Sequence, residues 1–86
     1  MMKQEGIYSV AQLAAYLKSE AYHLTYRQGS NDAYYNPRNR QYIFIPIFHE
    51  RLLSKEEIIE LFTESKATDL PPELEYHRFT LYLHAR

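Results

Sequence analysis

The sequence predicts a small α+β domain, in which one antiparallel sheet of about four strands carries two helices packed on one face. Three observations lead to this prediction. Apolar residues recur with helical spacing in two segments, they alternate with the period of a strand in the other segments, and turn residues separate the segments. The chain has 86 residues, which suffices for one domain, expected to span 1–86.

The first helix is expected at about 9–20. Ser9 and Gln12 have the spacing of a capping box, in which each side chain satisfies a backbone N–H of the other residue. The apolar residues that follow lie at i, i+3, i+4 and i+7, which places them on one face of a helix. These residues are Val10, Leu13, Ala14 and Leu17.

The second helix is expected from Ser54 to about residue 66 and begins in the same way. Ser54 and Glu57 form a second capping box. Pro71-Pro72 prevents the helix from continuing, because proline lacks the N–H that a helix interior requires. The apolar stripe of this segment consists of Ile58, Ile59, Leu61 and Phe62.

Three strands are expected between the two helices. Residues 22–27 alternate as a half-buried strand does, and 33–35 form a short second strand. Turns are expected at 28–32, where Gly29 can take a positive φ, and at 36–40, which contains Pro37. Residues 42–48 are apolar on both faces, which predicts a strand that is covered on both sides.

The C-terminal segment 74–86 alternates again, which predicts a last strand with one buried face and one polar, aromatic and basic face. The expected order is therefore α-β-β-β-α-β. The expected core consists of Val10, Leu13, Leu17, Ile43, Ile45, Ile58, Leu61, Phe62, Phe79, Leu81 and Leu83.

Composition narrows the class of protein. There is no cysteine, which fits a reducing compartment, and no segment has the length of a membrane span or of a signal peptide, so a cytoplasmic protein with no membrane partner is expected. The net charge is −1, yet residues 21–49 carry three arginines and one aspartate, a balance of +2. The chain is rich in tyrosine, with nine Tyr and no Trp, and tyrosine suits half-buried faces and binding surfaces.

Three short motifs occur in the middle of the chain: Tyr26-Arg27-Gln28-Gly29-Ser30, then Tyr34 and Tyr35 in the next strand, then Ile45-Pro46-Ile47 before the second helix. With these motifs the chain resembles, over roughly residues 9–66, HicA-type toxins of bacterial toxin–antitoxin pairs. The resemblance implies a fold like that of a double-stranded-RNA-binding domain, and an RNA or toxin–antitoxin-type partner.

One residue departs from the pattern of this family. The family places a catalytic histidine directly after Gly-Ser, whereas this sequence has Asn31. A neutral amide cannot act as a general acid or base near pH 7. The resemblance therefore favours binding over RNA cleavage, and we expect no enzyme activity.

Residues 8–14 also resemble the opening helix of excisionase-like winged-helix DNA binders. That fold would need a recognition helix at 21–28. The period-two alternation of this segment favours a strand instead.

The function predicted from the sequence is a small non-catalytic binding module that uses tyrosine and arginine side chains on its sheet and turns. Aromatic rings stack on bases, and arginine contacts phosphates. We expect no metal and no cofactor. The candidate RNA-binding or partner-binding residues are Arg27, Tyr34, Arg38, Arg40, Arg78, Tyr82 and Arg86.

Two other classes of function stay open. A protein-interaction or inhibitor protein from a phage or defence system could act as a homodimer with partner contacts, because Tyr and Arg are enriched in protein interfaces and a last strand could pair with another chain. The acidic helix, with Glu56, Glu60 and Glu64, could meet a basic partner. A weak ribonuclease would use His49, beside Glu50, as its proton-transfer group.

Overall fold

The computed structural model describes residues 7–65 and 70–85. It confirms a mixed α+β domain with antiparallel sheets, and it changes the order of the elements. Three helices and five strands, two of them only two residues long, lie within the described residues. The elements are β1 (Tyr8–Ser9), α1 (Val10–Ser19), β2 (His23–Gln28), β3 (Asn31–Asn36), β4 (Gln41–Pro46), β5 (Leu52–Leu53), α2 (Lys55–Ser65) and α3 (Pro72–His84).

The main sheet has three strands rather than four, in the order β2-β3-β4. Both pairings are antiparallel, and their register places Tyr35 opposite Tyr42 and Ala33 opposite both Tyr26 and Phe44. The short strands β1 and β5 form a separate antiparallel pair. Gly29 lies in the β2–β3 turn with a φ of 61°, which confirms the expected turn.

Both predicted capping boxes are confirmed. At the start of α1, the Ser9 N–H donates to Gln12 Oε1 at 2.8 Å and the Gln12 N–H donates to Ser9 Oγ at 3.1 Å. At the start of α2, the Ser54 N–H donates to Glu57 Oε1 at 2.9 Å and the Glu57 N–H donates to Ser54 Oγ at 3.1 Å. Each pair satisfies two backbone donors that the helix leaves open, which fixes where the two helices begin.

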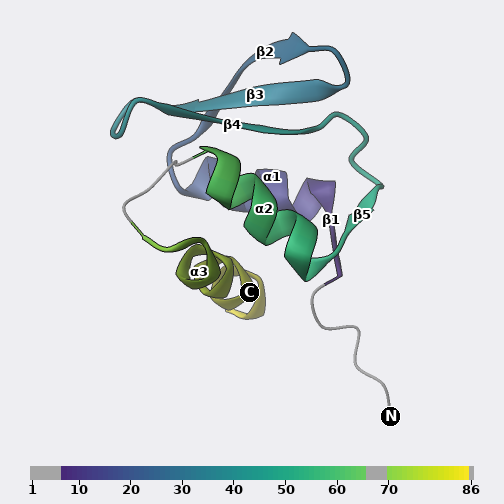
Figure 1. Cartoon of the computed structure of the whole chain (residues 1–86), viewed down its shortest axis with the longest axis vertical. Helices are drawn as coiled ribbons and strands as arrows, with labels where there is room; N and C mark the ends of the chain where they lie inside the picture. The colour runs from purple at the N-terminus through teal and green to yellow at the C-terminus, as the bar shows by residue number, and fades with distance from the viewer. Residues whose placement is uncertain (1–6, 66–69, 86) are drawn as a thin grey trace.

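The elements form three layers, which Figure 1 shows from the sheet to α3. Helices α1 and α2 lie beneath the sheet, nearest to β4, while β2 lies furthest from them. Helix α3 packs on the far side of α1 and α2. None of the helices in 7–65 and 70–85 combines the length and the apolar character that crossing a membrane requires.

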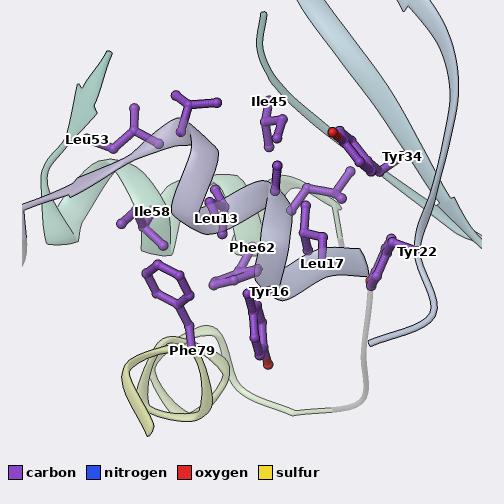
Figure 2. Packing of buried hydrophobic residues seen from close by; sticks show 13 residues of the cluster. Leu13, Tyr16, Leu17, Tyr22, Tyr34, Ile45, Leu53, Ile58, Phe62 and Phe79 are labelled. Atoms are coloured by element: carbon purple, nitrogen blue, oxygen red, sulfur yellow. The ribbon is translucent and has the colours of Figure 1, made fainter. Parts of the chain in front are cut away.

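The core lies between these layers (Figure 2). Most of the expected core residues are buried, whereas Leu61 and Leu83 are half-buried at its edge and Leu81 is 53% exposed. Three tyrosines that were not expected in the core are also buried, namely Tyr16, Tyr22 and Tyr34. The confirmed core residues are Val10, Leu13, Leu17, Ile43, Ile45, Ile58, Phe62 and Phe79.

The predicted strand at 74–86 is wrong, because this segment forms helix α3. Helix α2 ends at Ser65, and Pro72 is the first residue of α3, a position where its fixed φ suits a helix. Phe79 and Leu83 are spaced for a helix face as well as for a strand face. The exposure of Leu81 distinguishes the helix from the strand, because a strand would bury Leu81 on the same face as Phe79, whereas Leu81 is exposed.

Helix α3 is attached to α1 by polar and aromatic contacts. The Tyr16 hydroxyl donates to the buried carboxylate of Glu75, and Arg78 Nη2 lies 2.9 Å from Glu20 Oε1. The Phe79 ring lies with its centroid 5.5 Å from that of Tyr16. This arrangement makes α3 a part of the core.

Two predictions about the exposure of the sheet are also wrong. All six residues of β2 are exposed, rather than every second one. In β4, Ile43 and Ile45 are buried, while Tyr42 on the other face is exposed. Helices α1 and α2 both contact β4 from one side of the sheet, and no helix of the described residues covers its second face.

Candidate functional site

The open side of the main sheet carries four aromatic residues, which we call the aromatic face: Tyr26, Tyr35, Tyr42 and Phe44. Successive side chains of a strand point to opposite sides of a sheet. Tyr34, Ile43 and Ile45 point into the core, so their neighbours Tyr35, Tyr42 and Phe44 point away from it. Tyr26 of β2 joins them, because it lies opposite Ala33.

The four rings touch in one continuous cluster with Tyr42 at its centre. The Tyr42 centroid lies 4.8 Å from that of Tyr35, 6.0 Å from that of Tyr26 and 6.2 Å from that of Phe44. These separations fall within the range of favourable aromatic pairs, about 4.5–7 Å. These contacts pack the four rings against one another.

Two rings of the aromatic face remain open to solvent. Tyr26 is 45% exposed and Tyr42 is 38% exposed, while Tyr35 and Phe44 are half-buried. Ala33 lies between Tyr26 and Phe44 and is fully covered. Its small side chain lets the two flanking rings approach to 6.2 Å.

Two arginines lie in the turn that joins β3 to β4, next to this face. Asn36 organises the turn, since its Oδ1 accepts from the Arg38 N–H at 2.9 Å and its backbone carbonyl accepts from the Arg40 N–H at 2.7 Å. Arg40 has a φ of 60°, a conformation that few non-glycine residues adopt. Both arginines are exposed, and neither forms an ion pair within the part of the chain that the structure describes.

Arg27 lies on the opposite side of the sheet from the aromatic rings. Its Nε is 2.9 Å from Oδ1 of the buried Asp32, which lies directly opposite it on β3. Asp32 shares its side of the strand with Tyr34 by alternation. The charge of Arg27 is therefore partly offset by a neighbouring carboxylate.

The remaining candidate residues lie elsewhere. Tyr34 is 1% exposed, which corrects its expected place on the surface: its ring fills the core beneath β3. Arg78 and Tyr82 belong to α3, at the far side of the molecule from the sheet, where Arg78 pairs with Glu20 and Tyr82 packs on Tyr16. Arg86 lies outside the described residues.

The structure thus brings Arg38 and Arg40 together with aromatic residues that the sequence did not single out. The signal for them was present in β4, where Tyr42 and Phe44 alternate with the isoleucines. Alternation separates the two faces of a strand, but it cannot say which face a helix will cover. The sequence predicted that strand 42–48 is covered on both faces, so Tyr42 and Phe44 were not expected on the surface.

His49, the histidine considered for catalysis, lies on the surface next to the start of α1. His49 is exposed, and its backbone carbonyl accepts from the Ala11 N–H at 3.1 Å. Within residues 7–65 and 70–85, no group of His, Cys, Asp and Glu side chains is placed to hold a metal ion. Asn31 begins β3 and is exposed there.

Compared with protein-family models, with curated proteins and with solved structures, the chain matches none of them. The resemblance to HicA-type toxins therefore stays a prediction.

Proposed function

We propose that this chain is a small, non-catalytic module that binds single-stranded RNA on its aromatic face. The observation that carries the proposal is the cluster of four touching rings on the uncovered side of a three-stranded sheet. An uncovered aromatic sheet surface is a recurrent means of binding unpaired bases, because every base can stack on a ring.

The charge distribution supports the same ligand. Arg38 and Arg40 extend from the β3–β4 turn, and Tyr35 and Tyr42 lie one pair of residues further along the two strands. A strand of RNA stacked on these rings would bring its phosphates within reach of the turn. The arginines would then contact backbone oxygens while the rings contact bases.

The absence of a histidine after Gly29-Ser30 supports binding rather than cleavage. Asn31 can donate and accept hydrogen bonds, but it cannot exchange a proton near neutral pH. If the resemblance to HicA-type toxins reflects descent, the chain would have kept a nucleic-acid surface and lost the group that cleaves.

The test is a titration of a fluorescently labelled single-stranded RNA, followed by anisotropy. Tyr42→Ala should weaken binding by roughly tenfold, because a base–aromatic stack contributes about 1–3 kcal/mol. Tyr42→Phe keeps the ring and should bind nearly as well as the original chain. Equal affinity of the alanine and phenylalanine variants would refute stacking on this face.

The same titration repeated over a range of salt concentrations tests the arginines. Two phosphate contacts to a single strand predict a salt slope, d log K/d log [salt], of roughly −1.4. Arg38→Ala combined with Arg40→Asn should flatten this slope, and asparagine is chosen because it tolerates the positive φ of residue 40. Arg51→Ala is the matched control, since Arg51 is exposed but paired with Glu57.

A second candidate function is favoured by β2. Among residues 7–65 and 70–85 this strand pairs only with β3, so no described strand covers its outer edge. Its exposed residues include Leu24 and Tyr26. An open edge can accept a strand from a second copy or from a protein partner. Sedimentation analysis tests this function. It would be favoured if the chain dimerises, if Thr25→Pro abolishes the dimer, and if no RNA binds.

A further inference from the structure

A recess of about 200 Å³ opens beside the aromatic face, between β4 and the C-terminal end of α2. It is smaller than the sites that hold drug-sized ligands, about 300–1,000 Å³, and so is suited to a single ring. Tyr42 and Phe44 belong both to the aromatic face and to this recess. Its lining consists of Gln41, Tyr42, Phe44, Leu61, Glu64 and Ser65.

The lining combines apolar walls with a few polar groups. Tyr42, Phe44 and Leu61 supply flat or apolar surface, and Glu64 supplies carboxylate oxygens that accept hydrogen bonds. Gln41 supplies an amide that both donates and accepts. Glu64 is exposed and forms no ion pair with any residue in 7–65 or 70–85, so its carboxylate can accept from a ligand.

We propose that this recess selects a base that carries an exocyclic amine, such as cytosine, over uracil. The inference rests on the proposed function, because the base must belong to a strand that is stacked on the aromatic face. The Glu64 carboxylate would accept from the amine of cytosine, as acidic side chains do when they read that base. Uracil has a carbonyl oxygen at the same position, which Glu64 would repel.

The charges around the recess suit a base edge rather than a phosphate. Glu64 and Glu60, one turn apart on α2, disfavour the phosphate backbone on that side. Arg40 directly precedes Gln41, so positive charge lies at the β3–β4 end of the recess. A strand would therefore keep its phosphates at the turn and direct one base towards Glu64.

The experiment compares labelled oligocytidine and oligouridine of equal length, by anisotropy at one salt concentration. The two bases are nearly the same in size and differ at two neighbouring edge positions: the exocyclic group at C4, and N3, which carries a hydrogen only in uracil. The chain should bind oligocytidine at least about fivefold more tightly, the lower end of what one good base contact contributes. Glu64→Gln should bring the ratio close to one, because an amide can either accept or donate.

Glu56→Gln is the matched control, since Glu56 is an exposed residue of the same helix, outside the recess, and loses the same charge. It should leave the ratio unchanged. Equal binding of the two oligonucleotides, or an unchanged preference in Glu64→Gln, would overturn the inference and leave RNA binding intact. Binding of neither oligonucleotide would instead overturn the proposed function, and the inference with it.

Discussion

Tyrosine has two roles in this protein, and the difference lies in what covers the ring. Tyr16 and Tyr22 are buried, and their hydroxyls have hydrogen-bond partners in Glu75 and Asn36. Tyr26 and Tyr42 leave about two-fifths of their surface open on the sheet. A residue with an apolar body and a polar tip serves both purposes, so a high tyrosine count alone could not separate core from surface.

The buried tyrosines predict a loss of stability at alkaline pH. Burial raises the pKa of Tyr22 to about 12, although its hydrogen bond with Asn36 lowers it somewhat. Burial, and then the hydrogen bond with Glu75, also raises the pKa of Tyr16. In the unfolded chain both hydroxyls ionise near pH 10. Above that pH the folded state retains protons that the unfolded chain releases, so the free energy of unfolding falls by about 1.4 kcal/mol per pH unit for each such tyrosine.

Urea unfolding between pH 9 and pH 12 measures this effect. Stability should be level with respect to these two groups below pH 10 and should decline from pH 10 towards pH 12. The stability of the Tyr22→Phe variant should decline less steeply, because one of the two ionising hydroxyls is removed. An identical decline in Tyr22→Phe would show that Tyr22 is not responsible.

Single residues were predicted well where the local chain decides their role. Ser9, Gln12, Ser54 and Glu57 were assigned correctly, because a capping box involves only residues three apart. Tyr34 was misplaced because its burial depends on α1 and α2, which cover its side of the sheet but lie far from it in the sequence. No local pattern carries that information.

At the scale of elements, the two predicted helices and the three-stranded meander between them were predicted close to their observed bounds. The C-terminal segment was assigned to the wrong class. The strand was predicted from residues that alternate with period two, namely Phe79, Leu81, Leu83 and Ala85. Pro72 was expected only to prevent the preceding helix from continuing, whereas it begins α3. Short apolar runs fit both periods, so tertiary packing decides between them.

The helical assignment of α3 can be tested with two matched substitutions. A strand would bury Phe79 and Leu81 on the same face, whereas α3 buries Phe79 completely and leaves Leu81 53% exposed. Phe79→Ala should therefore cost about 3–5 kcal/mol, since it opens a cavity beside Tyr8 and Tyr16.

Leu81→Ala should change stability by no more than about 0.5 kcal/mol, as most surface substitutions do. Urea denaturation gives the free energy of unfolding of the two variants. A Phe79→Ala variant that fails to fold would agree with the expected loss of stability. A comparable loss in both variants would indicate that residues 79 and 81 share a buried face.

At the scale of the whole molecule, the layered arrangement explains why one side of the sheet is open. Helices α1 and α2 cover one face, and α3 packs on them rather than on the sheet (Figure 1). The fourth strand that was expected would have widened the sheet. Its replacement by a helix leaves a three-stranded sheet whose second face has no covering element among the described residues.

The same arrangement divides the expected binding surface. Arg38 and Arg40 lie at one end of the sheet, while Arg78 and Tyr82 lie on α3, on the other side of the helical layer. The sequence identified residue types that suit RNA, but it could not place them on one surface. The fold brings Arg38 and Arg40 of the β3–β4 turn next to the aromatic face, whereas it places the other described candidate residues elsewhere.

The most direct test of the proposed function is a map of backbone amide shifts by NMR, recorded while a single-stranded RNA is added. The amides of Tyr26, Tyr35, Tyr42 and Phe44, and those of residues 38–40 in the turn, should move together and saturate at the same RNA concentration. The amides of α3 should stay unchanged. Shifts that concentrate on α3, or a spectrum that does not respond to RNA, would contradict the assignment of RNA binding to this face.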